Sequence, residues 1–195
     1  FTFSAISYSR ICRKTAGFID SGEFISGAIT AFFFFFLMRI FDEFKDAQDD
    51  AKYRPYRPVP RGLISLRELG WLGFGIIIIQ IIINFLTMPV MLGVYFPVLI
   101  YLFLMTKEFF VRQWLKAHPA AYMLSHLIIL PLINFYTAGL DWIIAGENTP
   151  PKGLGFFLMT TFLNGIVIEI GRKIRFHKIF KQLLIKKFSI SYLNL

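Results

Sequence analysis

Long apolar stretches alternate with short polar ones along the chain. The densest are an unbroken run of phenylalanines at 32–36 and a run of isoleucines at 76–83 that only Gln80 interrupts. A helix needs about 20 apolar residues to cross the hydrocarbon core of a bilayer. The expected fold class is therefore all-α, a polytopic transmembrane helix bundle. The predicted spans are 24–41, 69–86, 89–105, 120–140 and 154–170.

The composition of the chain agrees with a membrane protein. Hydrophobic residues make up 56% of its 195 residues and charged residues 17%, against roughly 25% charged in soluble domains. The mean hydropathy is +0.60. These values exclude a disordered or nucleic-acid-binding tail. A single cysteine cannot form an intramolecular disulfide, and three isolated histidines without ligand neighbours argue against a zinc site.

Basic residues are distributed unevenly between the two sides that alternating spans create. Of the 21 Lys and Arg residues, 17 lie in the segments 39–67, 107–116 and 172–187, which fall on the same side. The positive-inside rule places that side in the cytoplasm. We therefore expect a multi-pass integral membrane protein whose 39–67 segment faces the cytoplasm.

The two ends of the chain differ from the central spans. Residues 1–9 are apolar but too short to cross a bilayer, and we interpret them as the end of a truncated first helix. A signal peptide fits less well, because a basic leader is lacking. From Phe176 onward, apolar residues at helical spacing alternate with lysines, which predicts a basic amphipathic helix on lipid or an aberrant tail. We divide the chain into a membrane domain, 1–175, and this tail, 176–195.

The most unusual segment follows the first predicted span, where five acidic residues fall within 42–50. If the helix continues, Asp42, Asp46 and Asp50 form one stripe, each offset by roughly 40° from the last, with Glu43 beside it. Like charges at this spacing repel, and an aspartate deep in a bilayer costs about 2.5 to 3.5 kcal/mol. A divalent cation would compensate. Because Mg²⁺ is commonly shared between one or two carboxylates and substrate phosphates, the stripe predicts a metal-bridged phosphate site.

Basic residues around the acidic stripe suit the same chemistry. Arg donates bidentate hydrogen bonds to phosphate oxygens, and Lys supplies a point charge. Prolines at 55, 58 and 60 stiffen the loop that carries most of these residues. An alternative stays open, in which acids and bases pair in a solvated cap and the bases only set the topology. The candidate phosphate ligands of this segment are Lys45, Lys52, Arg54, Arg57 and Arg61.

Two motifs in this region resemble those of the UbiA-type membrane prenyltransferases. Residues 42–50, DEFKDAQDD, are similar to that family's first aspartate-rich motif, N-D-x-x-D-x-x-x-D. Residues 55–62, PYRPVPRG, are similar to its P-x-R-P-x-P-x-G segment, at the expected distance. Asp42 stands where Asn is usual and Glu43 where Asp is usual, and both replacements retain oxygen ligands. The resemblance covers roughly residues 1–175.

The resemblance implies a function and a cofactor. Such a protein transfers an isoprenyl group from an isoprenyl diphosphate to a small lipophilic or aromatic acceptor within the membrane, with Mg²⁺ as cofactor. Asp42 and Asp46 would be the catalytic carboxylates and would share the metal with Glu43 and Asp50. The diphosphate contacts implied in this half of the site are Lys45, Lys52, Arg57 and Arg61.

The resemblance also implies a second acidic motif, D-x-x-x-D, on a later helix across a central cavity. The candidate segment, 164–175, reads NGIVIEIGRKIR and resembles the second-motif region of one UbiA-like subgroup. Glu169 would be a metal ligand, and Arg172 and Lys173 would bind diphosphate, although Lys173 stands where a carboxylate is usual. The alternative is a helix-end ion pair between Glu169 and Lys173. Because the family continues with further acids and helices, we interpret the bundle as a truncated UbiA-like one.

Other functions and simpler roles stay open. The chain could be a catalytically inactive membrane fragment, or a cation transporter that uses the acidic helix mouth, although transporters carry paired ionisable residues at membrane depth. A CDP-alcohol phosphotransferase is a poor rival, because its D-G-x-x-A-R signature is lacking. His118 and His126 suggest a shared proton relay, against which ordinary hydrogen bonding is the simpler account. We expect Gln80, Asn84 and Asn134 to link helices, and Asp141, Glu147 and Lys152 to lie in a solvated loop on the far side.

Overall fold

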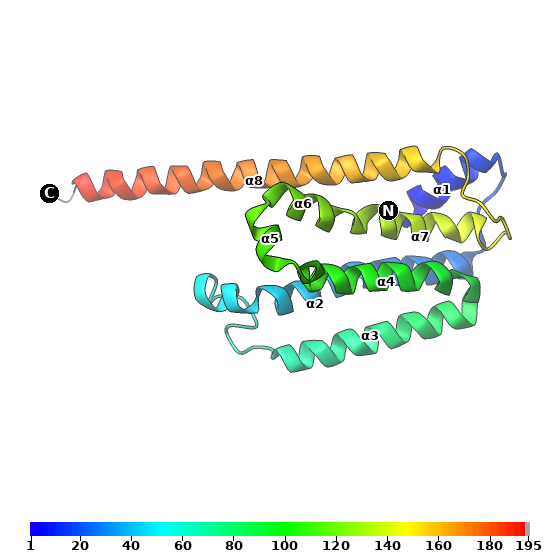
Figure 1. Ribbon diagram of the computed structural model, residues 1–195, viewed down its shortest axis with the longest axis horizontal. Coiled ribbons are helices and arrows are strands. Elements are labelled where there is room, and N and C mark those ends of the chain that lie inside the picture. Colours follow the sequence, from blue (N-terminus) through cyan, green and yellow to red (C-terminus); the bar gives the residue numbers. More distant parts are fainter. Residues whose placement is uncertain (194–195) are drawn as a thin grey trace.

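The computed structural model describes the backbone of residues 1–193 and the side chains of residues 1–174. Within that part of the chain all regular structure is helical and no strand occurs, which confirms the all-α prediction. Most helices lie side by side along the longest axis of the molecule (Figure 1). They are α1 Thr2–Arg13, α2 Ser21–Tyr53, α3 Leu66–Thr87, α4 Leu92–Thr106, α5 Arg112–Ala117, α6 Pro119–Leu127, α7 Ile129–Trp142 and α8 Leu154–Leu193, with 3-10 turns η1 Pro89–Met91 and η2 Glu108–Phe110.

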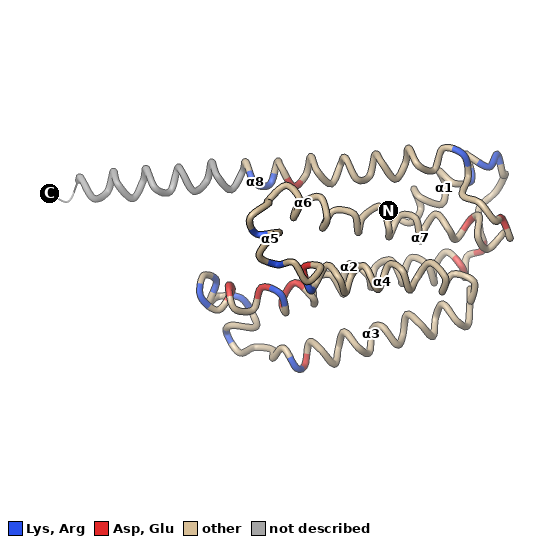
Figure 2. Tube along the Cα trace, viewed as in Figure 1, with Lys and Arg blue, Asp and Glu red and all other residues tan. Residues whose placement is uncertain are grey.

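Within the described residues, five helical segments are long and apolar enough to cross a membrane, which confirms the predicted spans. Charged residues of the described part gather toward the two ends of the bundle, and the stretch between them is almost free of charge (Figure 2). Such a distribution fits a multi-pass integral membrane protein, because a charge in hydrocarbon is costly. The spans are Ser21–Tyr53, Leu66–Thr87, Pro89–Thr106, Pro119–Trp142 and Leu154–Ile174.

The last helix, α8, continues without a break across the predicted domain boundary at residue 175. It packs against α7, α6 and α1. The amphipathic pattern predicted for 176–195 concerns side chains outside the described residues, and it stays a prediction.

The core forms where α2, α4 and α7 meet. The fully buried ring of Phe34 packs against Tyr95 of α4 and Tyr136 of α7, at centroid distances of 5.3 and 5.7 Å. Helices α2 and α7 approach closely at Gly27, where a Cβ atom would lie 2.1 Å from a methyl carbon of Leu140. Glycine leaves room for the Leu140 side chain at this crossing, and a larger residue would have to displace that side chain.

A buried polar network ties α2, α3 and α7 together. The amide of Gln80 donates to the carbonyl oxygen of Thr30 at 2.9 Å, and Asn84 Nδ2 donates to the Thr30 hydroxyl at 3.1 Å. The hydroxyl of Tyr136 in turn donates to Asn84 Oδ1 at 2.7 Å. The predicted helix-linking role of Gln80 and Asn84 is confirmed, whereas the buried Oδ1 of Asn134 finds no partner among the described residues.

Helix α2 has 33 residues and continues well past its apolar stretch. Ion pairs at helical spacing support this extension, among them Lys45 with Asp42 and Arg54 with Asp50. The helix ends next to Pro55, because the residue before a proline is disfavoured in the helical conformation. The predicted continuation of the helix into the acidic segment is confirmed, so the acidic side chains stand on a regular, rigid element.

A buried ionic cluster closes the opposite end of the bundle, where α1 packs on α7. Asp141, whose side chain is fully buried, accepts hydrogen bonds from Ser9 Oγ at 2.7 Å and from the guanidinium groups of Arg10 and Arg13 at 2.9 Å. The prediction that Asp141 lies in a solvated loop is therefore wrong. Its position within α7 places it among partners from α1, of which Arg10 is 131 residues away in the sequence.

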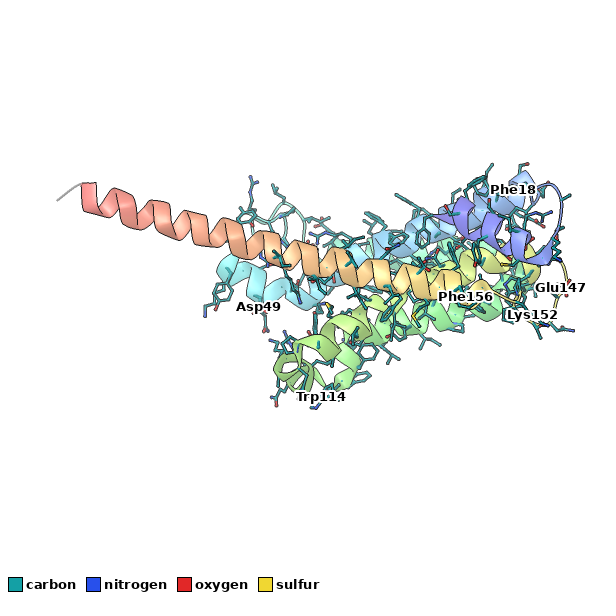
Figure 3. The ribbon with its side chains drawn as sticks, turned by 90° about the horizontal axis from the view of Figure 1, so that it is seen from above. Phe18, Asp49, Trp114, Glu147, Lys152 and Phe156 are labelled. Atoms are coloured by element: carbon teal, nitrogen blue, oxygen red, sulfur yellow. The ribbon has the colours of Figure 1, made fainter. Side chains whose placement is uncertain are left out.

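Replacing Asp141 by Ala should destabilise the bundle, because Arg10 and Arg13, only 13% and 17% exposed, would lose their buried counter-charge. Breaking a buried pair from one side costs about 3 to 5 kcal/mol. Glu147 is the matched control: it is 56% exposed, lies in the α7–α8 connection (Figure 3) and is 3.4 Å from Arg13. Its replacement by Ala should cost less than about 1 kcal/mol. Denaturant titration in detergent measures both losses, and equal losses would contradict the assignment.

Candidate functional site

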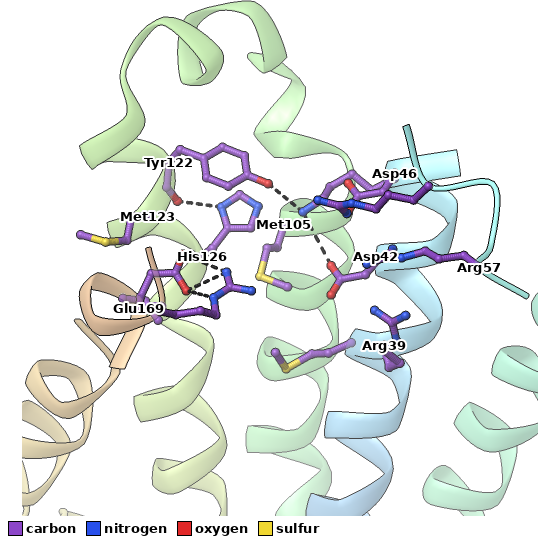
Figure 4. Close-up of a pocket in the computed structure, with 14 residues that line it drawn as sticks. Arg39, Asp42, Asp46, Arg57, Met105, Tyr122, Met123, His126 and Glu169 are labelled. Atoms are coloured by element: carbon purple, nitrogen blue, oxygen red, sulfur yellow. Dashed lines mark hydrogen bonds and ion pairs between the residues drawn. The ribbon is translucent and has the colours of Figure 1, made fainter. Parts of the chain in front are cut away.

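A pocket of about 370 Å³ lies at the end of the bundle opposite to the Asp141 cluster. It is formed by the extension of α2, the loop after it, the end of α4, helix α6 and helix α8 (Figure 4). Five basic and three acidic side chains line it, together with a tyrosine, a histidine and four apolar side chains. The pocket therefore combines charge, hydrogen-bonding groups and an apolar wall.

Helix α2 brings two of the predicted aspartates to this pocket. Asp42 and Asp46 are one turn apart, and both line it. Lys45 Nζ lies 3.6 Å from Asp42 Oδ1 and donates a hydrogen bond of 2.8 Å to the hydroxyl of Tyr122 on α6. Because the lysine side chain is only 11% exposed, this bond fixes it and ties α2 to α6 across the pocket.

Glu43 and Asp50 do not line the pocket. Asp50 belongs to the predicted acidic stripe, and Glu43 was expected beside it. Residues seven apart differ by only about 20° around a helix, so these two carboxylates lie on one line of α2. Both are buried, and Arg57 sits against them: its Nη1 pairs with Asp50 Oδ2 and lies 4.0 Å from Glu43 Oε1. Arg39 pairs with Glu43, and Arg54 lies 3.2 Å from Asp50. The stripe is thus divided between a pocket face and an arginine-binding face.

The same pairing positions the proline-rich loop after α2. Arg57 is anchored to the helix through its side chain, and backbone hydrogen bonds fold the loop around it, from Arg57 N–H to the Arg54 carbonyl and from Arg61 N–H to the Arg57 carbonyl, both at 3.0 Å. The Arg57 guanidinium also lines the pocket. The loop therefore contributes a basic wall whose position is set by buried carboxylates.

Glu169 and Arg172 reach the pocket from α8. Arg172 donates two hydrogen bonds to the Glu169 carboxylate, both of 2.9 Å. Lys173 Nζ lies 3.8 Å from Glu169 but does not line the pocket. A helix-end ion pair of Glu169 is therefore present, with Arg172 as its main partner. Because Glu169 lines the pocket as well, it stays a candidate ligand.

Not all predicted diphosphate ligands come together. Lys52 is exposed, with its Nζ 5.0 Å from the ring centroid of Tyr53, and Arg61 is exposed in the loop. Neither lines the pocket, nor does Lys173. The predicted bases that the structure gathers in the pocket are Lys45, Arg54, Arg57 and Arg172.

Several residues of the pocket were not assigned to the site from the sequence. Arg39 lies one helical turn before the acidic segment, and this spacing could have predicted that Arg39 belongs to the site. Tyr122 and His126, one turn apart on α6, carry no such signal, because 77 residues separate Tyr122 from its partner Lys45. The apolar lining residues, which have the composition of any membrane span, are Met38, Met105, Met123 and Leu127.

The proposed relay between two histidines is not formed. His118 stacks on Trp114 at a centroid distance of 4.4 Å and does not line the pocket. His126 does line it, without His118. Ordinary packing and hydrogen bonding therefore account for His118.

The pocket could hold a magnesium ion on two carboxylates rather than in a cage of protein ligands. Among the side chains of residues 1–174, no three Asp, Glu, His or Cys groups come together as a metal site, and the predicted set of Asp42, Glu43, Asp46 and Asp50 is split. Mg²⁺ commonly takes one or two carboxylates and completes its shell with water and substrate phosphate. Asp42 and Asp46 fit that donor set, with Glu169 as the third carboxylate of the pocket.

Removing the Asp50 carboxylate should loosen the loop that carries Arg57, because Asp50 is the buried partner of both Arg54 and Arg57. For Asp50→Ala we expect the amides of residues 57–63 to exchange about tenfold faster or more, which corresponds to about 1.4 kcal/mol. Asp49→Ala is the matched control, since Asp49 is exposed on the same turn of α2 (Figure 3). Hydrogen-exchange mass spectrometry in lipid nanodiscs measures the rates. Similar rates in both variants would show that Asp50 does not hold the loop.

No family model matches this chain, and no curated protein or solved structure matches it either. The geometry of the pocket and the motifs at 42–50 and 55–62 are therefore the features that bear on function.

Proposed function

We propose that this protein is a membrane-embedded transferase that binds an isoprenyl diphosphate in the pocket together with Mg²⁺. It transfers the isoprenyl group to a small lipophilic or aromatic acceptor. The observation that carries the proposal is one pocket that joins Asp42 and Asp46, a surplus of basic side chains and an apolar wall. The resemblance of 42–50 and 55–62 to UbiA-type prenyltransferases supports the same conclusion.

The charge of the pocket suits a diphosphate. Five basic side chains line it against three acidic ones. Arg57 directs Nη1 toward Asp50, and Arg172 directs Nε and Nη2 toward Glu169, so each guanidinium keeps other N–H groups for a ligand. Phosphate oxygens would accept charge-assisted hydrogen bonds from those groups.

In the proposed reaction the bond between the allylic carbon and the diphosphate oxygen breaks, and the electron pair stays on that oxygen. Lys45, Arg57 and Arg172 stabilise the charge that develops there, which is where electrostatic catalysis acts. Asp42 and Asp46 would hold Mg²⁺, which supplies further positive charge to the leaving group. The carbocation-like carbon then bonds to the acceptor, which gives up a proton to the released diphosphate.

The apolar wall suits the isoprenyl chain. Methionine side chains are flexible and fill irregular space, and three of them line the pocket, among them Met105 and Met123 (Figure 4). A wall of this kind also keeps water away from a reactive carbon. The diphosphate would thus lie among the charged groups and the chain along the methionines.

We place the pocket on the cytoplasmic side of the membrane. The segments 39–67, 107–116 and 172–187, which hold 17 of the 21 Lys and Arg residues, belong to the pocket end by the alternation of the spans. The positive-inside rule assigns that end to the cytoplasm.

A cation transporter fits the structure less well. The buried side chains of Gln80, Asn84 and Tyr136 are neutral and hydrogen-bonded. The buried carboxylates of Glu43, Asp50 and Asp141 lie toward the ends of their spans. Ion pathways usually carry ionisable residues at membrane depth. The ionisable side chains described here gather toward the helix ends instead (Figure 2).

Replacing Asp46 by Asn should lower turnover of radiolabelled isoprenyl diphosphates by about 100-fold or more, as expected for loss of one group that supports developing charge. Asp49→Asn is the matched control, because Asp49 is exposed and does not line the pocket. The assay uses protein in nanodiscs with MgCl₂, donors of several chain lengths and a panel of lipophilic acceptors. Chelation with EDTA should abolish turnover.

Donor turnover that survives Asp46→Asn unchanged would remove the metal-binding role assigned to Asp46. Uptake of Mg²⁺ or Mn²⁺ into sealed vesicles, in the absence of diphosphate, would favour the transporter. Folded protein that shows neither turnover nor uptake would identify an inactive membrane protein.

A further inference from the structure

A shallow, open groove lies on the outer face of the first half of α3. It has a volume of about 430 Å³ and is lined by Arg67, Gly70, Trp71 and Phe74. Because Gly70 lacks a side chain, the groove reaches toward α2, where Phe44 lies 3.4 Å from the position that a Cβ atom of Gly70 would occupy. Helices α3 and α8 lie at opposite edges of the bundle (Figure 1), so this groove is separate from the pocket.

An exposed apolar stripe continues from the groove along the rest of α3. Residues at intervals of three or four share one face of a helix. The exposed side chains at this spacing are Trp71, Phe74, Ile78, Ile82 and Phe85. The only charged residues of α3, Arg67 and Glu68, lie in its first turn, at the pocket end of the bundle (Figure 2). The stripe therefore has one charged end and is apolar over the rest of its length.

The guanidinium of Arg67 has unused hydrogen-bonding capacity. Arg67 is exposed and forms no ion pair with the side chains of residues 1–174. The carboxylate of the neighbouring Glu68 is turned back to the start of the helix, where it accepts hydrogen bonds from the backbone N–H and the hydroxyl of Ser65, both of 2.8 Å. A guanidinium carries five N–H donors and binds phosphate oxygens in a bidentate manner. Arg67 is therefore available to an anion outside the protein.

The groove suits a phospholipid better than a free anion. A free phosphate ion would contact Arg67 alone, because the other lining residues are a glycine and two aromatic residues. A phospholipid presents a phosphate, then ester groups and then hydrocarbon with increasing depth in the membrane. Arg67, Trp71 and Phe74 follow in the same order along α3, which rises about 1.5 Å per residue. Tryptophan suits the middle position, since its ring is apolar and its N–H donates a hydrogen bond.

We propose that this groove binds an anionic phospholipid of the leaflet at the pocket end, with the lipid phosphate on Arg67 and one acyl chain along the apolar stripe. A zwitterionic phospholipid binds less tightly, because its own ammonium group offsets the attraction between phosphate and guanidinium. The site lies outside the pocket and does not depend on the reaction proposed there.

Tryptophan fluorescence in lipid vesicles tests the proposed site. The chain has three tryptophans, and replacing Trp114 and Trp142 by Phe leaves Trp71 as the only one. The vesicles mix phosphatidylcholine with phosphatidylglycerol, and bromine on the acyl chains of one of the two lipids quenches an indole that it contacts. We expect brominated phosphatidylglycerol to bind at Trp71 about fivefold more tightly than brominated phosphatidylcholine, which corresponds to about 1 kcal/mol. Equal quenching by the two lipids would overturn the inference.

Two pairs of variants locate the preference for the anionic lipid. Arg67→Gln should make the two affinities equal, whereas Lys116→Gln, which removes an exposed base of α5, should leave the preference unchanged. Gly70→Leu fills the groove and should abolish the preference although Arg67 remains. Gly75→Leu is its matched control, because a Cβ atom at Gly75 meets no neighbour within 4 Å and Gly75 does not line the groove. A preference that survives either Arg67→Gln or Gly70→Leu would contradict the assignment.

The same measurement distinguishes a bound lipid from a second copy of this chain. A second copy on the stripe would shield Trp71 from both brominated lipids, and quenching would rise as the protein is diluted with lipid. That result would overturn the inference. Quenching by phosphatidylglycerol that is independent of the protein-to-lipid ratio would support it.

Discussion

The pairing of Arg57 with Asp50 and Glu43 is the interaction on which the arrangement of the pocket depends. Helical geometry puts these two carboxylates on one line of α2 and the pair of Asp42 and Asp46 on another. By neutralising the first pair, the arginine allows α2 to continue through five acidic residues in 42–50. It also fixes the proline-rich loop beside the second pair, whose carboxylates stay available to a ligand.

The carboxylates at the two ends of the bundle differ in how completely they are paired. At the end where α1 meets α7, the Asp141 carboxylate is fully buried and saturated by Ser9 and two arginines. At the pocket end, Asp42 is paired with Lys45 alone among the described side chains, at 3.6 Å, and stays 42% exposed. Unused hydrogen-bonding capacity, rather than charge as such, distinguishes the pocket from the closed end.

Properties of neighbouring residues were enough to predict the membrane spans and the continuation of α2, since apolar length and helical spacing are local. They were not enough to say which acids face the pocket. A stripe at intervals of four drifts by roughly 80° between Asp42 and Asp50, which turns Asp50 toward the loop. Contacts between residues distant in the sequence were not predicted. Asp141 is 131 residues from Arg10, and Lys45 is 77 residues from Tyr122. No periodic pattern in one chain encodes such pairs.

The length of α2 links the pocket to the lipid around it. Its 33 residues measure about 50 Å at 1.5 Å per residue, whereas the hydrocarbon core of a bilayer is about 30 Å thick. The part of α2 that exceeds this thickness extends beyond the hydrocarbon core. It holds the acidic side chains at a fixed distance from the last apolar turn of the helix. In a thicker bilayer these carboxylates lie closer to the hydrocarbon core, where an ionised carboxylate is costly. In a thinner bilayer they lie closer to water. Membrane thickness thereby becomes a variable that sets the solvation of Asp42 and Asp46.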